Sequence, residues 1–192
     1  GSGMHLHLSL YDNQGENLLS PRNSKKLNQA VSGILDLMPE SMIFCAPHAN
    51  SYHRFEENSY APINATWGKD NRTTALRIPS GNEDSTRIEH RLSGADANPY
   101  LVMAMLISGF LHGFEEDPEI PPETIGNGYE DGSRPLPQSW EAALDLFQNK
   151  SRLSSILGQE FSTLYRQLKF GEQKRFRRVI TPHEYDWYLH TV

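Results

Sequence analysis

The first residues that could do chemistry are two histidines and a serine near the start of the chain. In segment 4–10, His5, His7 and Ser9 alternate with apolar residues. An extended chain would place these three polar side chains on one face. Imidazole is both a proton carrier and a common metal ligand. The shared face favours a binding site, while the simpler interpretation is that each histidine is a hydrogen-bonded packing residue.

A second group of residues is cationic. The chain carries a formal net charge of −6, yet five arginines lie within positions 54–91: Arg54, Arg72, Arg77, Arg87 and Arg91. The planar guanidinium group forms paired hydrogen bonds with phosphate and carboxylate oxygens. If these side chains converge, they would bind anions. The alternative is that they form solvated ion pairs on a sheet face, with Glu83, Asp84 and Glu89.

One carboxylate lies among these arginines. Alternation along a strand at 87–91 would place Arg87, Glu89 and Arg91 on one face and the residues between them on the other. A carboxylate between two guanidinium groups suits a site for a metal ion and a phosphate. It equally suits a structural ladder of salt bridges, and the pattern alone leaves both open.

Short strands are expected to position these side chains. Apolar alternation predicts strands at 4–10, 61–67, 75–78 and 88–92. The turn-forming residues 79–82 make the last two of them neighbours.

The rest of the chain is expected to be mostly helical. The spacing of apolar residues predicts helices at 24–38, 98–114, 139–149 and 153–168, and a capping box at 181–184 predicts a further short one. Ser24 and Asn98 are the expected N-caps, and Pro39 and Gly171 the expected stops. Segment 115–137 is acidic and rich in Pro and Gly, which predicts a surface excursion, that is, a long loop on the surface. The sequence therefore predicts an α+β fold with a mainly antiparallel sheet and helices packed on it.

Composition excludes several classes of protein. A net charge of −6 argues against nucleic acid or an anionic membrane as a partner. The longest apolar run, 100–114, is shorter than the roughly 20 residues that span a bilayer. A single cysteine, Cys45, cannot form an internal disulfide, so we expect a cytoplasmic protein in which Cys45 is an inert packed thiol. His112, in the apolar run, is expected to be an interior or edge histidine with its hydrogen bonds satisfied.

Seven ordered motifs give the sequence a family resemblance. They are Gly-Ser-Gly-Met-His-Leu-His-x-Ser (1–9), Asn-Ser-Tyr-x-Arg (50–54), Ala-Pro (61–62), Asp-Asn-Arg-Thr (70–73), Arg-Ile-Pro (77–79), Arg-Ile-Glu-x-Arg (87–91) and Ala-Asn-Pro-Tyr (97–100). Their order and spacing resemble the glutamine synthetase family. The resemblance implies that 1–192 is the C-terminal portion of a catalytic domain, with site-bearing strands and a helix in 1–100 and a helical remainder in 101–192. In that family, ATP phosphorylates the γ-carboxylate of glutamate and ammonia attacks the acyl phosphate.

The resemblance also implies roles for the polar residues. His5 and Glu89 resemble ligands of Mg²⁺ or Mn²⁺. Contacts to ATP are implied for His7, Ser9, Arg77 and Arg87. Contacts to glutamate are implied for Gly1, Arg54 and Arg91. Arg72 resembles the arginine that faces the transferred phosphate.

One position departs from the ammonia-using enzymes. They have a glutamate before Ala61-Pro62, which guards the site and helps to accept a proton from ammonium, whereas this chain has Tyr60. A phenol is an apolar wall with one polar tip. The motifs around it resemble the branch that joins glutamate to organic amines, of the γ-glutamylputrescine synthetase type. Glu56 and Glu57 lie near enough in sequence to compensate if the loop folds differently.

A second departure concerns what the motifs leave out. The family's other metal-binding glutamates, and the small domain that completes a neighbouring subunit's site, precede the first motif. We therefore expect the chain to be a fragment that is inactive alone, from a parent that forms a homo-oligomeric ring. Three alternatives remain: the ammonia-using version of this ligase, a non-catalytic structural or interaction relative of the family, and a guanidino- or other phosphotransferase with a similar sheet.

Overall fold

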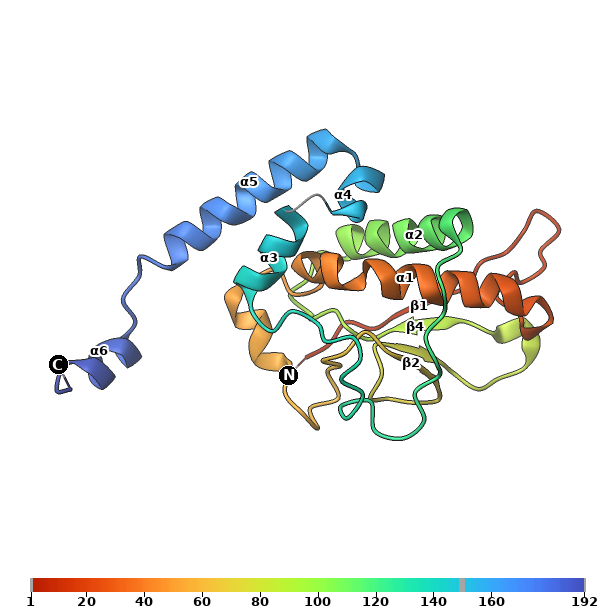
Figure 1. The fold of residues 1–192 in the computed structure, drawn as a ribbon, viewed down its shortest axis with the longest axis horizontal. Helices are drawn as coiled ribbons and strands as arrows, with labels where there is room; N and C mark the ends of the chain where they lie inside the picture. Colours follow the sequence, from red (N-terminus) through yellow and green to blue (C-terminus); the bar gives the residue numbers. More distant parts are fainter. Residues whose placement is uncertain (1, 149–150, 192) are drawn as a thin grey trace.

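A four-stranded sheet with two long helices over it forms the body of the molecule in the computed structural model (Figure 1), which describes residues 2–148 and 151–191. The strands are β1 (Leu6–Leu8), β2 (Trp67–Lys69), β3 (Leu76–Ile78) and β4 (Ile88–His90), in the order β1-β4-β3-β2. Strand β4 pairs antiparallel with both β1 and β3, and only β2 and β3 are parallel. The predicted α+β class and mainly antiparallel sheet are confirmed.

The strand register places the chemistry-bearing residues side by side. Glu89 on β4 lies opposite His7 on β1 and opposite Arg77 on β3. Cross-strand partners share a face of the sheet. The other face of β4 is fully buried at Ile88 and His90. The expected alternation at 87–91 is therefore present.

The predicted strand at 61–67 is wrong over most of its length. Only Trp67 belongs to β2, and residues 61–66 form an irregular segment. Its apolar residues are buried because the segment 128–136 runs beside it: Ala65 N donates to Arg134 O at 2.8 Å, and Leu136 N donates to Ile63 O at 2.9 Å. Part of the predicted surface excursion thus packs against the body and produces the alternation that resembled a strand.

The helices are α1 (Ser24–Cys45), α2 (Pro99–Glu116), α3 (Trp140–Gln148), α4 (Arg152–Leu157), α5 (Gln159–Phe176) and α6 (Pro182–Tyr188). Short 3-10 turns lie at Pro21–Asn23, Ala49–Arg54 and Glu83–Ser85. The predicted cap of α2 is confirmed, since the Asn98 side chain accepts from Tyr100 N, and so is the capping box of α6. The predicted end of the third helix at Asn149 lies outside the described residues.

Three predicted helix boundaries are wrong. Pro39 lies inside α1, where dense burial on both sides of it compensates for the lost hydrogen bond. Ser24 is the first residue of α1 and not its cap, because the turn at Pro21–Asn23, capped by Ser20, leads directly into the helix. Gly158, with a φ of +92°, separates α4 from α5, whereas Gly171 lies within α5.

Two isolated polar residues of the sequence, Cys45 and His112, are buried in the structure. Cys45 is fully buried, and burial raises the pKa of its thiol to about 11, so the prediction of an inert packed thiol is confirmed. His112 on α2 is buried, with its Nε2 2.8 Å from Asp36 Oδ2, as expected for a satisfied histidine. In the described residues, no helix has both the length and the apolar character to cross a bilayer.

Helices α5 and α6 extend away from the body as an arm (Figure 1). This arm exposes large apolar side chains: Leu164, Leu168, Phe170, Phe176, Val179, Ile180, Tyr185, Trp187, Tyr188 and Leu189. Its base is anchored by Tyr165, which stacks on Phe44 and donates from its hydroxyl to Ile43 O at 3.2 Å. The base is therefore part of the core, while the rest of the arm has an uncovered apolar surface.

Helices α1 and α2 approach each other through glycines. A Cβ atom on Gly113 would collide with the backbone oxygen of Gln29, and one on Gly33 would collide with the backbone oxygen of Gly109. Gly171 in α5 has open space around it.

We expect Gly113→Ala to lower the free energy of unfolding by about 2 kcal/mol, because the added methyl forces the two helices apart. Gly171→Ala is the matched control and should raise it by roughly 0.5–1 kcal/mol through helix propensity. Urea denaturation followed by circular dichroism measures both. Equal effects of the two substitutions would show that the close helix contact is not required.

Candidate active site

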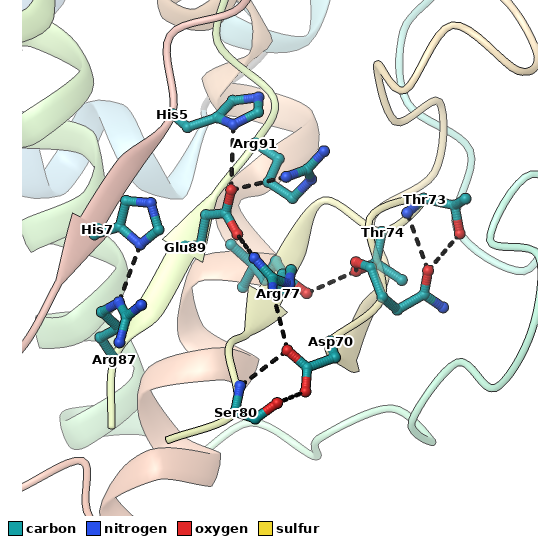
Figure 2. Close-up of polar contacts among 12 residues, drawn as sticks. His5, His7, Asp70, Thr73, Thr74, Arg77, Ser80, Arg87, Glu89 and Arg91 are labelled. Carbon is teal, nitrogen blue, oxygen red and sulfur yellow. Dashed lines mark hydrogen bonds and ion pairs between the residues drawn. The ribbon is translucent and has the colours of Figure 1, made fainter. Parts of the chain in front are cut away.

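Glu89 is the centre of the polar cluster on the sheet (Figure 2). The residue is only 3% exposed. Its Oε2 accepts from Arg77 Nη1 at 2.8 Å, its Oε1 accepts from Arg91 Nη1 at 2.7 Å, and His5 Nδ1 lies 3.2 Å from Oε1. Three segments distant in sequence thus meet at one carboxylate.

The arginines keep Glu89 ionised. Burial alone would raise the pKa of this carboxyl, but the hydrogen bonds and positive charges of Arg77 and Arg91 outweigh it and hold the pKa below its usual value. For the pKa of His5, burial outweighs the effect of the oppositely charged neighbour. Burial, followed by the charge of Arg91, lowers the pKa of the His5 imidazole despite the nearby Glu89. His5 is therefore neutral at physiological pH, the form in which imidazole binds a metal.

A hollow of about 340 Å³ opens beside this cluster. It is lined by His5, Tyr60, Arg72, Arg77, Glu89 and Arg91. Arg72 is exposed and makes no hydrogen bond or ion pair with any residue that the structure describes. The hollow thus brings together three of the five predicted anion-binding arginines, one of them without a partner.

Arg54 lines a second hollow of about 250 Å³ with Asn50, Ser51, Asp96 and other residues. Its Nη1 donates to Leu92 O at 2.8 Å. Gly3 lies beside one lining residue of each hollow, since an added Cβ there would lie 3.2 Å from both Arg54 Nη2 and His5 Nε2. A glycine at this position lets the two side chains approach. The adjacent predicted contact Gly1 lies outside the described residues.

The remaining candidates flank the Glu89 cluster. His7 Nδ1 accepts from Arg87 Nε at 3.3 Å, so His7 and Arg87 form a pair at the next position along β1 and β4 (Figure 2). Ser9 lies farther along, and its hydroxyl donates to Thr86 O at 3.4 Å. Tyr60 is 62% exposed and has a φ of +59°, in the left-handed region. The chain turns sharply there, and the phenol stands at the edge of the hollow.

A divalent ion is the cofactor that these residues would hold. Within residues 2–148 and 151–191, no group of three or more His, Cys, Asp or Glu side chains gathers in a metal-binding arrangement. His5 and Glu89 supply one nitrogen and one oxygen donor, which suits Mn²⁺ or a hydrated Mg²⁺ whose other ligands are water and phosphate oxygens. The Nε atoms of Arg77 and Arg91 are buried donors without an acceptor in the described chain. The cluster therefore fits an ion accompanied by an anionic substrate.

One member of the site was missed from the sequence. Asp70 accepts from Arg77 Nη2 at 2.9 Å and from Ser80 N at 2.9 Å, and it also bonds the Ser80 hydroxyl (Figure 2). These bonds, with the backbone bond from Ser80 the strongest contribution, hold the pKa of Asp70 below its usual value. Asp70 therefore fixes Arg77 from the side opposite Glu89. Asp70 opens the motif Asp-Asn-Arg-Thr, and aspartate readily adopts the left-handed conformation that Asp70 has. This position in the motif was the signal in the sequence that could have pointed to Asp70.

Comparison with known proteins identifies the family. The model of the "Glutamine synthetase, catalytic domain" family matches residues 1–188. The chain belongs to the glutamine synthetase family. A relative named gamma-glutamylputrescine synthetase PuuA, from Escherichia coli (strain K12), is 44% identical over 98% of this chain and 41% of its own length. A second, gamma-glutamylethanolamide synthetase GlnA4 from Streptomyces coelicolor, is 37% identical over 98% of this chain and 40% of its own.

A solved structure described as apo GmaS without ligand superposes with a TM-score of 0.85 at 28% identity, covering 99% of this chain and 45% of that one. The chain thus spans less than half the length of these relatives. The predicted resemblance to the glutamine synthetase family, on the side of the organic-amine enzymes, is confirmed.

The ionised Glu89 should stabilise the fold in a pH-dependent way. Its pKa is lower in the folded chain than in the unfolded one, so its contribution is present above about pH 4.3, the usual value for glutamate, and is lost as the pH falls through the lower folded pKa. At pH 7, Glu89→Gln should cost about 3 kcal/mol of unfolding free energy, because it leaves two buried guanidinium groups without their anion.

The difference between wild type and Glu89→Gln should shrink as the pH is lowered from 7 to 3, measured by urea denaturation at each pH. Glu57→Gln, at an exposed position, is the control and should have little effect at either pH. A difference that stays constant with pH would contradict an ionised Glu89.

Proposed function

We propose that this chain is the C-terminal part of the catalytic domain of an ATP-dependent ligase that joins the γ-carboxylate of glutamate to an organic amine. The observation that carries the proposal is the convergence of His5, Arg77 and Arg91 on Glu89, beside a hollow that the unpartnered Arg72 also lines. Family membership and the names of the relatives support it. The activity concerns the complete protein and would take place in the cytoplasm.

The reaction proceeds in two steps. An oxygen of the glutamate γ-carboxylate attacks the γ-phosphorus of ATP, the bond to the bridging oxygen breaks, and ADP leaves. The amine nitrogen then attacks the acyl carbon of γ-glutamyl phosphate, phosphate leaves with the electrons of the carbon–oxygen bond, and the nitrogen loses one proton. The products are a γ-glutamyl amide, ADP and phosphate.

The arginines supply the electrostatic part of catalysis. Arg72, which makes no hydrogen bond or ion pair in the described chain, would stabilise charge on the transferred phosphoryl group. Arg77 and Arg87, with His7 and Ser9, bind the nucleotide. Arg54 and Arg91, with Gly1, hold the carboxylates of glutamate, which is consistent with the hollow that each of the two arginines lines.

His5 and Glu89 would hold Mg²⁺ or Mn²⁺, which when bound screens phosphate charge. These residues are two ligands of a larger set, and we expect the complete protein to add further ligands to the water and phosphate oxygens. Alone, the chain would keep the anion-binding surface and lack ligase activity, so we expect no glutamate-dependent release of ADP from it.

Tyr60 favours an organic amine over ammonia. Where ammonia-using relatives place a carboxylate that attracts ammonium, this chain places a phenol at the rim of the hollow. The change removes an attraction for a small cation and adds an apolar wall.

The uncovered apolar residues of α5 and α6 support the further proposal that the complete protein is a homo-oligomer, a ring in this family, since such surfaces mark contacts between chains.

A panel of amines tests the choice of substrate. We expect the complete protein encoded by the gene that carries this sequence to release phosphate faster with putrescine than with ammonium, in the presence of ATP, glutamate and Mg²⁺. Tyr60→Glu should move the preference toward ammonium, because it restores the carboxylate. A clear preference of the wild type for ammonium would reject the organic-amine assignment, and no ligase activity with any amine would favour a non-catalytic relative.

Metal binding tests the His5–Glu89 pair directly in this chain. We expect His5→Ala to weaken Mn²⁺ binding by about tenfold or more, measured by electron paramagnetic resonance of the free ion. His7→Ala is the control on the same strand face and should leave binding close to that of the wild type, because His7 bonds Arg87 and not Glu89. Equal losses in both variants would contradict the assignment.

A further inference from the structure

A third hollow, of about 490 Å³, adjoins the candidate active-site hollow of His5 and Glu89. Tyr60 and Arg72 line both of them. A substrate that reacts in the candidate active-site hollow can therefore extend past Tyr60 into this one. One wall of this hollow is the segment 123–126, which is part of the predicted surface excursion 115–137.

The segment 123–126 is firmly held. Asn71 Nδ2 donates to Thr124 O at 3.1 Å and to Gly126 O at 2.8 Å, and Thr124 N donates to Trp67 O at 2.9 Å. Between these anchors, Ile125 is 92% exposed. A large apolar side chain on a fixed backbone, in a hollow that Tyr60 also lines, offers a surface for an alkyl chain.

Glu123 adds a negative charge to this hollow, and one of its carboxylate oxygens can accept a further hydrogen bond. Its Oε1 accepts from Lys69 N at 2.9 Å, which fixes the carboxylate against β2. Its Oε2 lies 3.8 Å from Lys69 Nζ, a long pair with an exposed lysine that contributes little. The other carboxylate of the hollow, Asp70, is already bonded by Arg77 and Ser80. Glu123 Oε2 is thus the acceptor on this wall that a second cation can reach.

We propose that this hollow is the subsite for the distal end of the acceptor amine, with the alkyl chain between Tyr60 and Ile125 and a distal ammonium group on Glu123. The substrate class that fits is a short α,ω-diamine. The inference rests on the proposed function and adds to it the residues that select the amine.

The test compares two amines that differ only at the distal end, putrescine and n-butylamine, in the complete protein. Glu123→Gln should lower the ratio of kcat/KM for putrescine to that for n-butylamine by roughly threefold to tenfold, as expected for one charged contact, and should leave n-butylamine unaffected. Glu119→Gln is the matched control: Glu119 precedes Glu123 by four residues but lines another hollow, so the ratio should not change.

Lys69→Met separates a charge effect from a structural one. Removing the competing ammonium group should raise the ratio for putrescine, while the backbone bond from Lys69 N to Glu123 remains. An equal loss for both amines in Glu123→Gln, or an unchanged ratio, would overturn the subsite. Absence of ligase activity with every amine in the wild type would instead contradict the proposed function, and the subsite with it.

Discussion

A buried carboxylate with two guanidinium partners is the constraint on which the rest of the structure depends. Removing an ionised group from water is costly unless its charge and hydrogen-bonding capacity are satisfied. Glu89 meets this condition only when Arg77 on β3, Arg91 just after β4 and His5 just before β1 are all in register. The same register that satisfies Glu89 builds the wall of the active-site hollow. Arg77 is held in turn by Asp70, so the cluster continues into the loop after β2.

The alternation of polar and apolar residues predicted which side chains of this wall share a face. Strict alternation at 4–10 and 87–91 indicates which side chains share a face, and both patterns hold. The family motifs then connect strands that are distant in sequence. Local patterns could not give the pairing of β2 with β3 or the position of Asp70, because these depend on turns with positive φ and on contacts made after the chain folds.

Two of the wrong predictions, at Pro39 and at 61–67, have a common physical cause. Pro39 and Gly171 are poor helix formers, but burial overrides the first, and the second lies within an otherwise regular helix. The alternation at 61–67 comes from packing against 128–136 and not from sheet pairing. Segment 115–137, read as a surface excursion, supplies both this packing and the wall at 123–126. Tertiary contacts therefore determined the parts of the fold that surround the site, and short-range propensity did not.

Transfer of a phosphoryl group to the γ-carboxylate of glutamate is the step on which the proposed function depends most. To test this transfer, the complete protein is supplied with ATP, putrescine and glutamate that carries ¹⁸O in both γ-carboxylate oxygens. The phosphate released is then analysed by mass spectrometry. We expect one ¹⁸O atom in each phosphate, because the attacking oxygen leaves with phosphorus when the amine displaces it. Phosphate without ¹⁸O, formed alongside γ-glutamyl amide, would contradict the account.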